Sequence, residues 1–295
     1  MTPEATMAES ELTNGILVGP YRAPKNMSRE AKGSIHDDAT AQKLGFRGGT
    51  VAGSIHMEQF PPLLVGVFGP QWFERGGLSC YFRNATTHEE RVRALVEKPE
   101  SLRSDQQVRV WMEHEDGRQV LEGTADIGTP GEPSMVRSVL ANRHLGGDLR
   151  ILGGVSEGQC IDPVPSRLTN DVAEARREII TEPLDWYYDA SPWGGPIATP
   201  NLMVRAMRAM EQGLTGLRTH GAVGLFGAIE LKQINGPVFI ERDYENRGQV
   251  LALGETPKSE FIWYESTIAE PGGKDVASMI MMLRFMKASS SLWQR

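Results

Sequence analysis

The feature of the sequence that most constrains its fold is an internal repeat. Residues 45–52 read GFRGGTVA and residues 192–198 read PWGGPIA, so each segment holds an aromatic residue, then Gly-Gly, a β-branched residue and Ala. Each segment leads into an apolar stretch, residues 55–68 in the first half and residues 202–210 in the second. Because helix, strands and turns then follow in the same order in both halves, the chain is predicted to hold two related modules.

Both apolar stretches are predicted to form helices. The second stretch has the i, i+3, i+4, i+7 spacing of one helix face at Met203, Ala206, Met207 and Met210. Thr199 can cap this helix and Pro200 suits its first position. The first stretch contains Pro61-Pro62, so we expect a kink or two short helical pieces there.

Runs with strand character follow each helix. In the first half they are residues 78–82, 91–97, 108–114 and 120–127, and Asp116-Gly117 predicts a hairpin between the last two. In the second half they are residues 224–231, 238–243, 249–255, 261–269 and 276–286. A helix followed by several antiparallel strands in each half predicts an α+β fold rather than a βαβ repeat.

These boundaries predict four regions. Residues 1–14 are expected to be a flexible N-terminus, residues 15–130 the first module, residues 131–176 a Gly- and Pro-rich connector, and residues 177–290 the second module.

Composition narrows the classes of function. The net charge of −7 and the lack of a Lys/Arg run oppose binding to nucleic acid or to an anionic membrane surface. No signal peptide is recognisable, and no apolar run approaches the roughly 18 residues that a bilayer requires. Cys80 and Cys160 stand in unrelated contexts, which suits a cytoplasmic protein without disulfides or a zinc site. We expect no metal and no cofactor.

One segment resembles a known family. Ser34-Ile35-His36-Asp37-Asp38, followed by Gly45-Phe46 and by residues 49–53 (GTVAG), resembles the signature of MaoC-like hydratases and dehydratases. Residues 78–84 also resemble the strand after that family's helix. The resemblance implies a tandem, or double, hot-dog fold, in which each antiparallel sheet wraps around a central helix. It also implies a substrate linked to CoA or to an acyl-carrier protein, and addition or removal of water at an enoyl or 3-hydroxyacyl thioester.

The chain departs from the family pattern in both halves. The family's catalytic Asp lies five residues before its His, where this chain has Ala31. In the second half the His-bearing segment is missing, because residues 191–193 run almost directly into Gly194-Gly195. Only His36 therefore occupies the position that the resemblance marks as catalytic.

Hydration of an enoyl thioester needs a general base, a proton donor for the α-carbon, and hydrogen-bond donors for the thioester oxygen. His36 is the candidate base, since an imidazole titrates near neutral pH. Glu30, Asp37 or Asp38 could replace the missing carboxylate, with Asp38 slightly preferred. The oxygen would be bound by backbone N–H groups at the start of the first helix, those of Gly53, Ser54 and Ile55.

Three further residues are candidates for substrate contact. His56 and Glu58 lie in the first helical stretch, but residues two apart do not share a helix face, so they are not expected to act as a pair. Trp193 precedes the second helix and could line an acyl pocket, although aromatic residues at such junctions more often pack in the core.

Two other functions stay open at this stage. Glu58, Asp37 or Asp38 could activate water in a hot-dog thioesterase. The broken dyad also fits a non-catalytic or repurposed protein of the same fold. Association into a homo-oligomer is plausible in each case, because exposed sheet edges offer a route to it.

Overall fold

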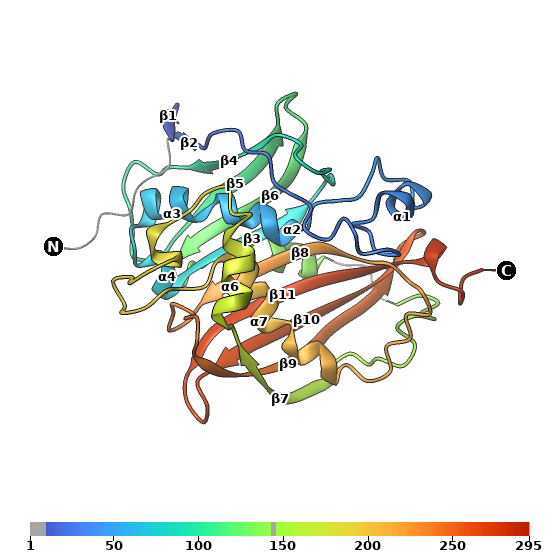
Figure 1. Ribbon diagram of the computed structural model, residues 1–295. Helices are drawn as coiled ribbons and strands as arrows, with labels where there is room; N and C mark the ends of the chain where they lie inside the picture. The colour runs from blue at the N-terminus through green and yellow to red at the C-terminus, as the bar shows by residue number, and fades with distance from the viewer. Residues whose placement is uncertain (1–9, 143–145, 295) are drawn as a thin grey trace.

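The computed structural model describes residues 10–142 and 146–294. Within these ranges the strands form one antiparallel sheet in the order β1-β2-β4-β5-β6-β3-β8-β11-β10-β9-β7 (Figure 1). The first six strands come from the N-terminal half and the last five from the C-terminal half. The predicted duplication therefore appears as two half-sheets that share one ladder.

The half-sheet of the first module follows the predicted strand order closely. Its strands are β1 (Glu11–Thr13), β2 (Ile16–Val18), β3 (Gly76–Phe82), β4 (Val92–Glu97), β5 (Gln106–His114) and β6 (Gln119–Ile127). The Asp116-Gly117 hairpin between β5 and β6 is confirmed, and Gly117 has a φ of 79°, which favours glycine. The short strands β1 and β2 were not predicted from the sequence. Of the predicted flexible N-terminus, residues 1–9 lie outside the described residues.

The second half-sheet contains one correction to the predicted strands. Its strands are β7 (Cys160–Arg167), β8 (Gly224–Gln233), β9 (Asp243–Glu255), β10 (Ser259–Ala269) and β11 (Asp275–Met286). The predicted strand 238–243 is wrong, because β9 begins only at Asp243 and Glu241 before it has a φ of 59°. That turn is also fixed by the Phe239 N–H, which donates to the Tyr244 hydroxyl at 2.9 Å.

The region predicted as a connector also contains ordered structure. Strand β7 lies within it and pairs with β9, and helix α5 (Met135–Ala141) precedes that strand. The alternating prolines of β7, Pro163 and Pro165, masked its strand character in the sequence. We propose that the second module begins at β7 rather than at residue 177.

The two predicted helices lie on the same face of the sheet (Figure 1). The first is broken, as expected from Pro61, into α2 (Gly53–His56), a 3₁₀ turn η1 (Met57–Gln59) and α3 (Pro61–Phe68). The second is α7 (Pro200–Met207), continued by η3 (Ala209–Gly213). The Thr199 hydroxyl accepts from the Leu202 N–H, so the predicted cap is confirmed. The other helical segments are α1 (Asp38–Lys43), α4 (Trp72–Arg75), α6 (Asn170–Arg177), η2 (Asp185–Tyr187) and η4 (Lys287–Ser289).

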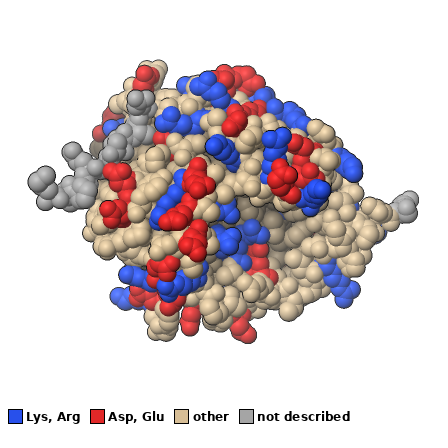
Figure 2. Space-filling view, in the orientation of Figure 1, with Lys and Arg blue, Asp and Glu red and all other residues tan. Residues whose placement is uncertain are grey.

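Apolar side chains from the helices fill the space above both half-sheets. Met57, Phe60 and Leu64 are fully buried from the first helix, and Met207 and Met210 from the second. None of the helices in the described ranges combines the length and the apolar character that crossing a bilayer requires. On the face shown in Figure 2, acidic and basic side chains are interspersed over both modules.

The modules join at the ladder between β3 and β8. It runs from Gly77 paired with Lys232 to Tyr81 paired with Ala228. Beyond this point the two strands separate: Phe82 continues its pairing with β6, and Gly224 continues the pairing of β8 with β11. The sheet thus opens at the boundary between the modules.

Candidate active site

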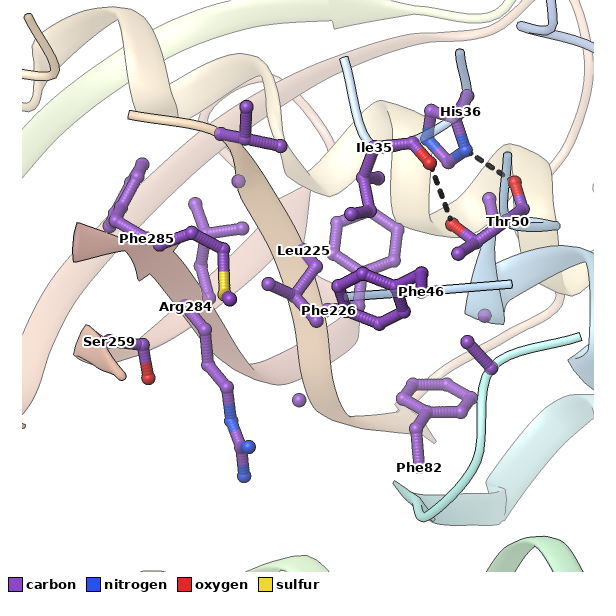
Figure 3. Close-up of a pocket in the computed structure, with 18 of the residues that line it drawn as sticks. Ile35, His36, Phe46, Thr50, Phe82, Leu225, Phe226, Ser259, Arg284 and Phe285 are labelled. Atoms are coloured by element: carbon purple, nitrogen blue, oxygen red, sulfur yellow. Dashed lines mark hydrogen bonds between the residues drawn. The ribbon is translucent and has the colours of Figure 1, made fainter. Parts of the chain in front are cut away.

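A cavity of about 930 Å³ occupies the place where the modules separate. Both diverging strands line it, through residues 82–86 from the first module and residues 222–227 from the second. His36 and Gly53 also line it, as do Leu283–Met286 at the end of β11. Figure 3 shows these walls to be largely apolar, with aromatic rings of Phe46, Phe82, Phe226 and Phe285. A mostly apolar cavity with a few polar groups is the usual form of a small-molecule site.

Local contacts hold the His36 segment against this cavity. The His36 carbonyl accepts from the Asn26 amide at 2.8 Å, and the Thr50 N–H donates to the Ile35 carbonyl at 3.0 Å. Gly49 packs so closely that a Cβ there would lie 2.0 Å from the His36 carbonyl oxygen. Gly49 of the repeat therefore serves close packing of backbone on backbone.

The surroundings of the His36 ring fix its tautomer. Its Nδ1 lies 2.7 Å from the Thr50 carbonyl oxygen (Figure 3). A carbonyl only accepts, so the proton of the neutral ring is on Nδ1 and Nε2 carries a lone pair. Nε2 makes no hydrogen bond to any described residue. The ring is half-buried in the cavity wall, so Nε2 is available as a base toward a ligand.

The two aspartates beside His36 are engaged elsewhere. Asp37 caps α1 through the Thr40 N–H and hydroxyl, and the Thr40 hydroxyl lowers the pKa of this carboxyl. Asp38 accepts from the Gly49 N–H at 2.7 Å and so holds the glycine turn. Within the described ranges neither carboxylate hydrogen-bonds to the His36 imidazole. Their contacts are those of residues that position the His36 segment.

Glu30, the other carboxylate considered at this position, lies outside the cavity lining. Glu30 is exposed, as is Ala31, which stands where the family has its Asp. No described carboxylate therefore replaces that Asp next to His36.

The start of α2 supplies one of the three predicted backbone donors to the cavity, since Gly53 lines it whereas Ser54 and Ile55 do not. Gly53 lines the cavity, and its N–H lies in the first turn, where a helix offers no internal acceptor. The Ile55 N–H donates to the Ala52 carbonyl at 2.9 Å, so this donor is already used. A Cβ on Gly53 would lie 2.5 Å from the Phe82 ring, which explains the glycine. The buried Ser54 hydroxyl accepts from the Asn201 amide at 2.8 Å.

His56 is a buried neighbour of the cavity rather than a solvated side chain. Its Nε2 lies 2.7 Å from the Thr86 hydroxyl, while Nδ1 has no partner among the described residues. Burial, together with the nearby His114, lowers the pKa of this imidazole to about 4 against the opposing effect of Glu90. His56 therefore remains neutral near pH 7 and can position Thr86 but carries no charge into the cavity.

Glu58 lies at the junction of the two helices and outside the residues that line the cavity. One oxygen accepts from the Asn201 N–H of α7 at 2.8 Å, and the other has no partner in the described structure. Burial raises the pKa of this carboxyl to about 7, against the opposing effect of hydrogen bonds from Thr199 and Asn201. Glu58 thus links the modules, and its place does not suit activation of water in the cavity.

Trp193 also lies away from the cavity. Its indole N–H donates to Glu74 at 2.8 Å, and its ring packs edge-to-face on Phe73 and Trp186 at centroid distances of 6.0 and 5.4 Å. The structure therefore places Trp193 in the aromatic packing between the modules.

The cavity wall opposite His36 could not be predicted from the sequence. Phe82, Phe226 and Arg284 come from three strands and meet only through the pairing of β3, β8 and β11. One signal could have pointed to Phe82, since it lies in the strand that resembles the family.

An alanine at Gly49 is expected to disturb the site through packing alone. The added methyl would meet the His36 backbone, which cannot move aside as a flexible side chain can. We expect Gly49→Ala to destabilise the fold by about 1–3 kcal/mol and to displace His36. Denaturant unfolding measures the loss of stability, and turnover of thioester substrates measures the displacement of His36.

Gly131→Ala is the matched control, because a Cβ there meets no atom within 4 Å. Equal behaviour of the two variants would contradict the packing role of Gly49.

Comparison with known proteins supports the fold assignment. No protein-family model and no curated protein matches the sequence. Among solved structures, one described as a MaoC domain protein dehydratase from Chloroflexus aurantiacus aligns over 96% of this chain and 99% of its own, with a TM-score of 0.63 at 12% identity. A Mycobacterium tuberculosis protein described as having a double hotdog fold aligns over 95% and 97%, with a TM-score of 0.60 at 10% identity.

A further structure, described as a MaoC-like dehydratase, aligns over 93% of this chain and 98% of its own, with a TM-score of 0.54 at 12% identity. The chain therefore has the α+β double hot-dog fold, as predicted. Its structural neighbours over nearly the full length are MaoC-like dehydratases and other double hot-dog proteins.

Proposed function

We propose that the protein is a hydratase or dehydratase that acts on an enoyl or 3-hydroxyacyl thioester, with His36 as the base. The observation that carries this proposal is the tautomer of His36, whose Nδ1 is bound to the Thr50 carbonyl while Nε2 remains free in a cavity built by both modules. The likeness to MaoC-like dehydratases supports the reaction class, and the acyl carrier would be CoA or an acyl-carrier protein.

A single imidazole can perform both proton transfers of a syn addition. Nε2 takes a proton from water as the water oxygen bonds to C3 of the enoyl group. The resulting imidazolium then returns a proton to C2 from the same face, so the sum is addition of one water molecule. The Gly53 N–H would donate to the thioester oxygen, where negative charge develops. The reverse sequence removes water.

The thioesterase alternative is not favoured, because of where its candidate carboxylates lie. Glu58 is outside the cavity lining, and both aspartates hold the His36 segment. Activation of water for hydrolysis would require one of these carboxylates beside the substrate carbonyl.

An assay on the purified protein tests the proposed reaction. With a panel of 2-enoyl-CoA thioesters, we expect loss of the enoyl chromophore without release of free thiol. Release of thiol would establish hydrolysis instead, and binding without turnover of any thioester would establish a non-catalytic protein.

A further inference from the structure

The charge of the cavity is opposite to that of the whole chain. The chain carries −7, but four of the charged side chains that line the cavity are cationic, Arg83, Arg208, Lys258 and Arg284, and one, Glu211, is acidic. Glu211 is fully used, since it binds Arg208 through both oxygens at 2.7 and 2.8 Å. The cavity therefore has an excess of positive charge and favours an anionic ligand.

Two cations of this wall have no carboxylate partner among the described residues, the exposed Lys258 and the half-buried Arg284. Arg83 pairs with Glu122, whereas in the described ranges no carboxylate pairs with Arg284. Its Nη2 donates to the Tyr81 hydroxyl at 2.9 Å, but its Nε is shut off from solvent without a partner. A guanidinium that lines a largely apolar cavity without a carboxylate partner favours an anionic group on a ligand.

The backbone makes room for this guanidinium. Register between β8 and β11 shifts after Met282, because Met282 pairs with Ala228 and the next residue pairs with Phe226. This leaves Gly227 unpaired in a β-bulge, and a Cβ there would lie 2.7 Å from the Arg284 Nε. A larger residue at position 227 would therefore displace Arg284 from its present place.

Arg284 and His36 lie in the same cavity but at different ends of it. Figure 3 shows the His36 ring and the Arg284 guanidinium on opposite sides of the drawn residues, with the side chain of Leu225 between them. A ligand that reacts at His36 would therefore meet Arg284 with a different part of its structure.

We infer that the substrate carries a carboxylate on its acyl part, bound by Arg284. The inference rests on the proposed function and adds a substrate class, the thioesters of dicarboxylic acids. Guanidinium and carboxylate form paired, charge-assisted hydrogen bonds, and Arg284 has no such partner in the described chain. The phosphates of CoA are the other source of anionic oxygens. They fit less well, since highly charged phosphates remain hydrated whereas the wall around Arg284 is largely apolar.

Matched substrates test the inference. We expect the wild-type protein to prefer an ω-carboxy 2-enoyl-CoA over the neutral thioester of the same length by at least tenfold in kcat/KM. Arg284→Met should remove this preference, mostly through KM, and Arg284→Lys should retain part of it. Arg109→Met, which removes an exposed arginine on β5 away from the cavity, serves as the control and should keep the preference.

Phosphate-free thioesters of N-acetylcysteamine separate the two sources of charge. If Arg284 binds the acyl carboxylate, the preference and its loss in Arg284→Met persist with these substrates. If the variant weakens both CoA substrates equally and neither phosphate-free substrate, Arg284 binds phosphate and the inference is overturned.

A binding measurement keeps this inference separate from the proposed reaction. Calorimetry with glutarate and with butyrate needs no turnover. Binding of glutarate that is lost in Arg284→Met supports the carboxylate site even if no thioester is hydrated. Equal binding of glutarate by both proteins, or no binding by either, overturns it even if hydration is observed.

Discussion

Replacement of His36 by Asn is expected to lower kcat/KM for hydration by about 10²–10⁴-fold, the usual contribution of a general base. An Asn amide can still donate toward the Thr50 carbonyl, so the segment keeps its place while the lone pair of Nε2 is lost. No described carboxylate near the ring could take over the proton transfer. We therefore expect the loss in kcat, with a small change in KM for the thioester.

His220→Asn is the control for this experiment. His220 is exposed, lies outside the cavity lining and has a φ of 43°, a conformation that Asn tolerates well. Circular dichroism and thermal unfolding should show both variants folded. Full hydration activity of the folded His36→Asn protein would remove His36 from the mechanism.

Replacement of Glu58 by Gln is expected to have an effect on stability that depends strongly on pH. The folded-state pKa of about 7 lies above the ordinary value of 4.5, so between these values the native chain holds a proton that the unfolded chain has lost. The stability of the wild type therefore falls, relative to the variant, as pH rises from 4.5 to 7. The difference amounts to roughly 3 kcal/mol, since one pKa unit corresponds to about 1.4 kcal/mol.

Denaturant unfolding of both proteins at pH 4.5 and at pH 8 measures this effect. The Gln side chain can accept from the Asn201 N–H as Glu58 does, so the low-pH comparison isolates the loss of the carboxyl group itself. Glu122→Gln, at an exposed ion pair with Arg83, controls for the loss of a carboxylate elsewhere. If the free-energy difference between wild type and Glu58→Gln is the same at both pH values, Glu58 is not held protonated by burial.

Much of the fold could be predicted because its signals are local in sequence. The cap at Thr199, the break at Pro61 and the Asp116-Gly117 hairpin each depend on residues within one turn. Strand β7 did not have such a signal, since its prolines obscure the pattern and its pairing partner β9 lies about 80 residues further along the chain.

Only the part of the cavity wall that carries His36 and Gly53 could be predicted from the sequence. His36 and Gly53 stand in one short segment whose pattern resembles a family, and both line the cavity. The roles of Asp37 and Asp38 were not predictable, because a carboxylate beside a histidine in sequence can cap a helix or hold a turn instead. Arg284 became a candidate only through the β-bulge at Gly227, which depends on the register of two strands.

The ladder between β3 and β8 has a consequence for how this protein would adapt to new substrates. It ends at Tyr81 and Ala228, so the width of the opening beyond them is set by the angle at which the two modules meet. A substitution along the ladder would change this angle and move the wall that carries Phe226 relative to the wall that carries His36. Substrate choice in this architecture can therefore evolve through substitutions in the β3–β8 ladder, at positions that do not line the cavity.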